Sequence, residues 1–145
     1  MSGGIASGVK WPLAAAAVQN ASLSANTASA VFVAIASQAV TVSRVGSNLL
    51  VSFKAHVIAA PLTGDGILAF SVNGGTTWVP ITSFGAGAAL GLVVQGDCLF
   101  VGMAAGAVTV SVGLRLNGTG TPGVGGDSNR PALLLISEQA PPMIA

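Results

Sequence analysis

The chain has 145 residues, of which 52% are hydrophobic and only 6% are charged, and its formal net charge is +1. About 25% of an average soluble domain is charged, so these figures argue against a lone monomer with an ordinary charged surface. The 5 cationic residues are scattered singly, which excludes a basic patch for nucleic acid, and no apolar run is long enough for a membrane span. We therefore expect one domain whose surface is covered by copies of itself or by a larger partner.

The N-terminal region is expected to be an arm rather than part of the core. Residues 1–10 are rich in glycine and serine and show no apolar pattern, which predicts a flexible arm with Trp11 as its first anchor. Residues 13–18 are rich in alanine and could form either a helical turn or a strand, of which we favour the extended form. Residues 19–29 combine small and polar side chains, which predicts a loop.

Short strands are expected from residue 30 onward. Residues 30–36 are apolar on both faces, which predicts a strand buried on both sides. Ser37 and Gln38 are expected to turn the chain before a second strand at 39–45. Residues 48–58 alternate most clearly, with one apolar face and one polar face. The apolar face carries Leu49, Val51, Phe53, Ala55 and Val57, and the polar face carries Ser52, Lys54 and His56.

The next segment predicts a hairpin between two turn signals. Residues 61–66 read as a strong turn, and 67–72 as a strand. Asn73-Gly74-Gly75 tolerates positive φ and predicts a hairpin turn into a strand at 76–82. Pro80 has no N–H to donate, which places that strand at a sheet edge or a bulge. Residues 83–89 are expected to be a loop.

Residues 94–116 are expected to form the central hairpin of the fold. Residues 108–116 alternate with period two: Val108, Val110, Val112, Leu114 and Leu116 share one face. Gln95-Gly96-Asp97 predicts a turn before the first strand, and Ala104-Ala105-Gly106 predicts a turn between the two strands.

The C-terminal part is expected to be a glycine-rich linker followed by a strand. Residues 117–130 are rich in glycine, which predicts a linker, and 132–137 predict a last strand. The expected fold is an all-β antiparallel sandwich, jelly-roll-like, with roughly eight or nine short strands and extended arms at both ends. The expected organisation is an N-terminal arm at 1–27, a sandwich core at 28–116, and a Gly-rich loop with a C-terminal strand or arm at 117–145.

The sequence offers little for catalysis or metal binding. His56 is the single histidine, Cys98 is the single cysteine, and the four carboxylates are spread along the chain. A catalytic triad, a zinc or calcium site and a glycosidase carboxylate pair all need closer sets of these residue types. We expect no enzyme activity, no metal and no cofactor, and we interpret Cys98 as a small buried hydrophobe.

The candidate functional residues are those suited to contact a partner. Trp78 could stack on a sugar if exposed, but we favour a role in the core or at a subunit boundary. A carbohydrate-binding module therefore stays as an alternative function. The candidate interface comprises Trp11, Lys54, His56, Trp78, Leu133 and Leu135.

One resemblance bears on function. Gln95-Gly96-Asp97 and the alternating strand that ends at Leu116 resemble the closing strands of small jelly-roll proteins, among them trimeric tumour-necrosis-factor-like domains and bacteriophage capsid decoration (cement) proteins. The segment from Asn73 to Trp78 is similar to turns in phage virion β-domains. The resemblance implies a homotrimer fixed to a protein shell at the capsid surface, with the major capsid protein as partner and with arms that reach neighbouring copies. Composition and charge separately lead us to expect no nucleic-acid and no membrane partner. A phage tail or fibre component is the alternative within this class.

Overall fold

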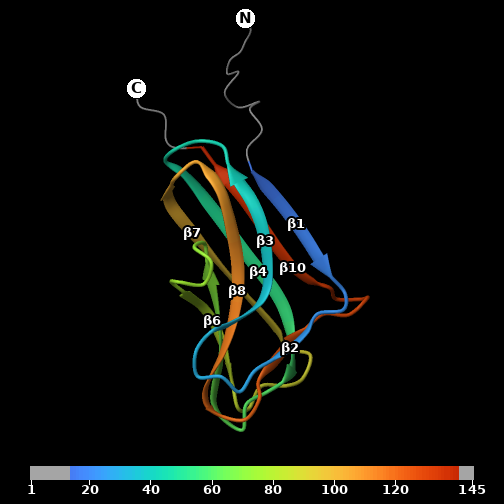
Figure 1. Ribbon diagram of the computed structural model, residues 1–145. Helices are drawn as coiled ribbons and strands as arrows, with labels where there is room; N and C mark the ends of the chain where they lie inside the picture. Colours follow the sequence, from blue (N-terminus) through green and yellow to red (C-terminus); the bar gives the residue numbers. More distant parts are fainter. Residues whose placement is uncertain (1–13, 141–145) are drawn as a thin grey trace, which may run out of the picture.

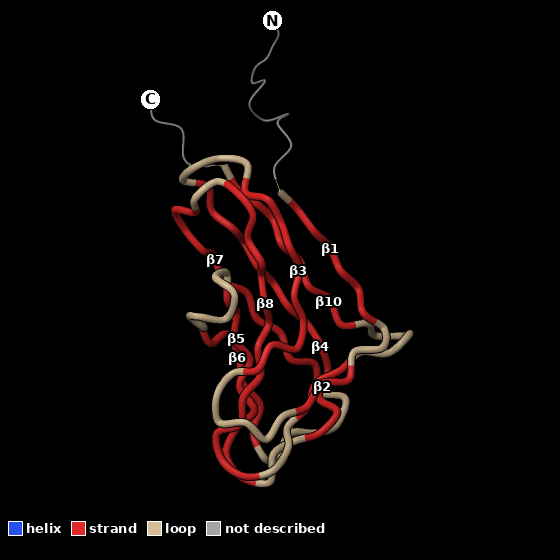
Figure 2. The backbone as a smooth tube through the Cα atoms, in the orientation of Figure 1, coloured by secondary structure: helices blue, strands red, loops and turns tan. Residues whose placement is uncertain are grey.

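The computed structural model describes residues 14–140, a β-sandwich of two antiparallel sheets with six and four strands. The all-β antiparallel fold predicted from the sequence is confirmed. Figure 1 shows β3 and β8 lying over β4 and β10, and Figure 2 shows that strands form most of the backbone. The strands are β1 Ala15–Asn20, β2 Ser24–Asn26, β3 Val33–Val42, β4 Ser47–Ala59, β5 Thr63–Ser71, β6 Val79–Gly85, β7 Val93–Met103, β8 Gly106–Thr119, β9 Gly123–Gly125 and β10 Ala132–Gln139.

The larger sheet is organised around β4. β7 pairs with one edge of β4, and β10 and then β9 pair with successive parts of its other edge. β1 extends β10 and β2 extends β9, so the described part of the predicted N-terminal arm contributes strands to this sheet. The smaller sheet has the order β3-β8-β5-β6.

The core lies between the sheets and follows the alternation of β4 and β8. The apolar face predicted for residues 48–58 is buried from Leu49 to Val57. On β8, Val110, Val112 and Leu114 are fully buried, and Val108 packs against the same cluster. Period-two alternation thus identified the two strands that supply the centre of the core.

The predicted central hairpin is wrong in its pairing. β7 pairs with β4 in the larger sheet, whereas β8 pairs with β3 and β5 in the smaller one. Residues 104–105 therefore connect the two sheets. Gln95-Gly96-Asp97 does not turn the chain, because these residues pair with Lys54, Phe53 and Ser52 in the middle of β7.

The predicted linker at residues 117–130 is also wrong. Its first residues end β8, and Gly123–Gly125 forms β9 between β4 and β2. Val124 is fully buried in the core and Pro122 is among the fully buried side chains. The glycines allow close packing here: a Cβ on Gly125 would lie 2.6 Å from the carbonyl oxygen of Leu23.

The reading of residues 30–45 needs two corrections. Ser37 and Gln38 do not turn the chain but pair with β8 inside one continuous strand, β3. The expected burial on both sides is absent, because the side chains of Val31 and Val33 are 71% and 44% exposed. The sandwich has two layers, so only one face of β3 packs against the other sheet and the opposite face has no layer over it among the described residues.

The hairpin around Asn73-Gly74-Gly75 is confirmed, although its boundaries move. β5 and β6 are antiparallel neighbours joined by residues 72–78, and Gly74 and Gly75 have positive φ. β6 is the edge strand predicted from Pro80, and a register shift lies beside that residue. The predicted turn at 61–66 ends too late, because β5 begins at Thr63. The predicted loop at 83–89 begins too early, because β6 continues to Gly85.

Candidate functional site

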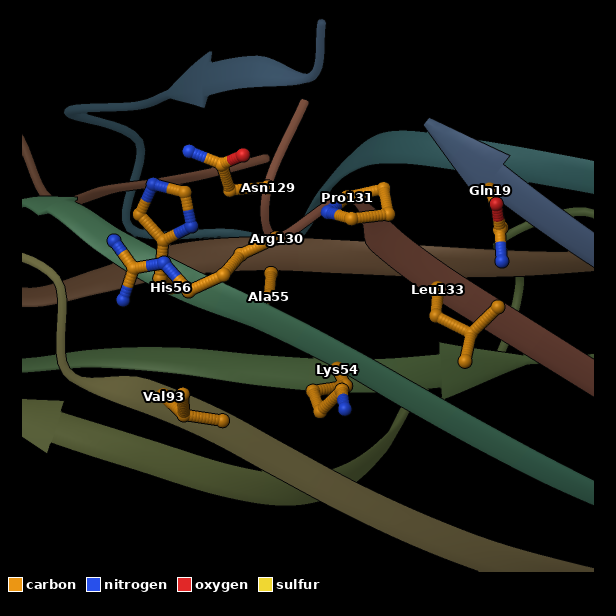
Figure 3. Close-up of a pocket in the computed structure, with 9 residues that line it drawn as sticks. All are labelled: Gln19, Lys54, Ala55, His56, Val93, Asn129, Arg130, Pro131 and Leu133. Atoms are coloured by element: carbon orange, nitrogen blue, oxygen red, sulfur yellow. The ribbon is translucent and has the colours of Figure 1, made fainter. Parts of the chain in front are cut away.

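Four of the six predicted interface residues come together on the outer face of the larger sheet. Lys54, His56 and Leu133 line one pocket of about 260 Å³, and Leu135 follows Leu133 on the same face of β10. Figure 3 shows the pocket, with His56, Asn129 and Arg130 at one end and Gln19 and Leu133 at the other. Trp78 directly precedes β6 of the other sheet, and Trp11 lies outside the described residues.

The pairing register arranges this face in rows across β1, β10, β4 and β7. Successive side chains of a strand alternate between faces, so every second residue of these strands points away from the core. Three rows are Gln19-Leu133-Lys54-Gln95, Ala17-Leu135-Ser52-Asp97 and Ala15-Ser137-Leu50-Leu99.

Apolar side chains are unusually prominent in these rows. Leu135 is 41% exposed and Leu99 is 45% exposed, and Val93 and Val101 on β7 are 49% and 71% exposed. Lys54 and Asp97 are the charged residues of the three rows. Clustered exposed apolar side chains of this kind mark interaction surfaces. We call this surface, defined by Leu50, Val93, Leu99, Val101, Leu133 and Leu135, the leucine face.

His56 closes one end of the pocket and is 8% exposed. Its Nε2 lies 3.9 Å from Asp127 Oδ2, and its Nδ1 is buried without a hydrogen-bond partner among residues 14–140. A buried polar atom without a partner loses its hydration and gains nothing in return.

The wall beside His56 is a short loop that separates β9 from β10. Asp127 Oδ1 accepts hydrogen bonds from the backbone amides of Asn129 at 2.9 Å and Arg130 at 2.7 Å. The bond from the Arg130 amide contributes most to holding the pKa of Asp127 below its usual value. Arg130 Nη1 donates to the carbonyl oxygen of Gly91 at 2.8 Å, which links this loop to the chain entering β7.

Trp78 covers the outer face of the smaller sheet instead of joining the leucine face. Its ring lies over Gly113, where a Cβ would come within 2.6 Å of Trp78 Cζ3. Phe32 packs beside it with ring centroids 5.5 Å apart, and the Arg115 guanidinium lies 5.3 Å from the Phe32 ring. One face of the indole is thus occupied by this chain, which leaves less of it for stacking on a sugar.

Sequence reasoning missed Gln19, Asn129, Arg130, Leu99 and Val93 as members of this surface. The alternation from Val93 to Leu99 indicates a strand with these side chains on one face. The wrongly predicted turn at 95–97 interrupted that strand, so its outward residues were not recognised. Asp127 and Arg130 fell within the false linker. Their approach to His56 depends on β9 and β10 sharing one edge of β4.

Other candidate chemistry is sparse across residues 14–140. This part of the chain contains no group of three or more His, Cys, Asp or Glu residues placed to hold a metal ion. No helix capable of crossing a membrane occurs among these residues. Cys98 is half-buried, and burial together with the adjacent Asp97 charge raises the pKa of its thiol.

No protein-family model matches the sequence, and no curated protein matches it significantly.

Proposed function

We propose that this chain is a structural virion protein, a phage capsid decoration protein that attaches to the major capsid protein through its leucine face. The observation that carries the proposal is the exposure of Leu99 and Leu135 on one face of the larger sheet. Fully burying an exposed leucine side chain contributes about 1.5–3 kcal/mol, so covering these two half-exposed side chains contributes roughly half of that each before the costs of association are subtracted. The low charge of the whole chain supports the same role, because little of its surface is specialised for free solution.

Binding to purified capsid shells tests the proposal directly. Leu135→Glu and Leu99→Glu place a charge on the leucine face, and each is expected to weaken co-sedimentation with shells at least about tenfold. Leu62→Glu is the matched control, because Leu62 is 78% exposed in the connection between β4 and β5. Equal binding by all three variants contradicts the proposal.

A phage tail or fibre component is the rival within the same class. Gold-labelled antibodies against the chain distinguish the two on intact particles. Label over the whole capsid supports a decoration protein. Label confined to the tail assigns the leucine face to a tail partner.

A carbohydrate-binding module is the second candidate, and the pocket beside His56 is the observation that favours it. Gln19, Lys54 and Asn129 offer polar groups around an apolar wall formed in part by Leu133. Binding on a glycan array that is lost in Lys54→Ala and kept in Trp78→Phe would favour this function. An array without any bound glycan favours the assembly role.

A further inference from the structure

One side of the sandwich is open between the edge strands β1 and β3. Two hollows of about 190 and 370 Å³ lie along this side. Half-buried Val18 and Ile35 line the smaller one, with the core residues Phe53 and Leu134. The opposite side is closed, because Ile81 of β6 packs directly on Gly96 of β7. We call the open side, lined by 14–20 and 35–41, the edge groove.

Within residues 14–140, no strand pairs with the outer edge of β1. Its sequence AAAVQN has no proline and no charge, and its register with β10 runs from Ala15 to Asn20 without a shift. β3, by contrast, has a register shift at Ala34–Ala36, and β6 carries Pro80. Exposed regular edges accept further strands, and bulges and prolines prevent this.

The hydrogen bonds of Ala14 identify the free groups on this edge. Glu138 N donates to Ala14 O at 2.7 Å, so the backbone of Ala14 faces β10. Because backbone groups alternate between the two edges of a strand, those of Ala15, Ala17 and Gln19 face the open side. They form a template for a strand laid into the groove.

We propose that the edge groove accepts residues 5–11 of a second copy of this chain as an added strand on β1. In the segment IASGVKW the alternate positions carry Ile5, Ser7, Val9 and Trp11, so an extended segment presents three apolar side chains and one serine on one face. The apolar side chains of that face suit Val18 and Ile35, and its serine suits the polar groups that also line the two hollows, such as Ser37 and Gln38. Trp11, one of the predicted interface residues, supplies the largest side chain of the segment.

The connection to β1 favours a second copy over the same chain. Only Pro12 and Leu13 separate Trp11 from Ala14. A two-residue hairpin turn needs positive φ, which glycine and asparagine provide and proline cannot. Pro12 therefore disfavours a tight hairpin between this segment and β1 of the same chain, which favours the groove of a neighbouring copy.

This inference goes beyond the proposed function, because it requires only copies of this chain and no capsid. Its test is the mass of the purified full-length chain by light scattering, compared with the monomer mass of 14.0 kDa. Ala17→Pro removes one outward N–H from the free edge and keeps the ladder with β10. Ala17→Thr retains that N–H and is the matched control.

We expect an oligomer for the wild type and for Ala17→Thr, and a monomer for Ala17→Pro and for a variant that lacks residues 1–11. Circular dichroism and the denaturation midpoint verify that each variant is folded. Hydrogen exchange at Ala15, Ala17 and Gln19 should be slow in the oligomer and fast in both monomers.

Two results would overturn the proposal. The first is an oligomer of unchanged mass for Ala17→Pro or for the truncated chain, because assembly then uses another surface. The second is a monomeric wild type. Slow exchange of the β1 amides in that monomer would indicate a strand added by the same chain, fast exchange would indicate an empty edge, and either result contradicts the proposal. Failure of either kind leaves the capsid-binding test of the leucine face unaffected.

Discussion

The carboxylate of Glu138 holds Ser43, 95 positions earlier in the chain, through both its backbone amide and its hydroxyl. The amide lies 2.9 Å from Oε1 and 3.1 Å from Oε2, and the hydroxyl lies 2.9 and 3.0 Å from the same two atoms. Ala14 N also donates to Oε1 at 2.9 Å. One side chain on β10 thus fixes the start of β1 and the turn between β3 and β4, which belong to different sheets.

Glu138→Gln is expected to destabilise the fold and to flatten its dependence on acid. Burial by itself raises the pKa of Glu138, but polar groups of Ser47, Ala14 and Ser43 outweigh it and lower the pKa to about 2. A lowered pKa stabilises the folded state above the ordinary value of 4.5, and this contribution is lost as the pH falls from 4.5 to about 2. At neutral pH the substitution should cost about 2 kcal/mol, measured by urea unfolding. A variant that keeps the full acid dependence of the wild type contradicts this assignment.

Gly113→Ala is expected to destabilise the protein by about 1–3 kcal/mol, because the new methyl group overlaps the Trp78 ring. Gly87→Ala is the control, since its Cβ would meet nothing within 4 Å. Chemical denaturation of both variants gives the comparison. In a Trp78→Ala background the cost of Gly113→Ala should largely disappear. An equal cost in both backgrounds argues against the contact.

Val124→Ala tests the finding that β9 belongs to the core. Val124 is fully buried, so loss of its methyl groups should cost about 2 kcal/mol of unfolding free energy. Val31→Ala, at a side chain that is 71% exposed, should change the unfolding free energy by less than about 0.5 kcal/mol. Similarly small losses of unfolding free energy at both positions would contradict the finding and would favour the predicted linker at residues 117–130.

Asp127→Ala is expected to loosen the wall of the pocket without unfolding the sandwich. The Asn129 and Arg130 amides lose the carboxylate that accepts their hydrogen bonds, so their hydrogen exchange should accelerate. Asp127→Asn keeps a side-chain oxygen at the accepting position and should retain most of the protection. Exchange that is unchanged in Asp127→Ala would show that other contacts hold the loop.

Part of the candidate site could be predicted from sequence and part could not. Alternation along β4 placed Lys54 and His56 on one outer face, because side-chain direction in a strand is a local property. Leu133 and Leu135 are two positions apart on β10, so for the same reason they lie on the same face of that strand. Asp127 and Arg130 could not be assigned to this site, because their position depends on where β9 ends and β10 begins along β4.

The sequence by itself determined that this chain is an all-β sandwich with little charge, which strands carry the core, and which residues of β4 face outward. These properties follow from composition and from the two-residue period of a strand. Only the tertiary structure decided that β7 and β8 belong to different sheets, that Gly123–Gly125 is a strand, and that β1 and β3 leave an open groove. Strand pairing joins residues far apart in sequence, and local alternation does not specify a partner.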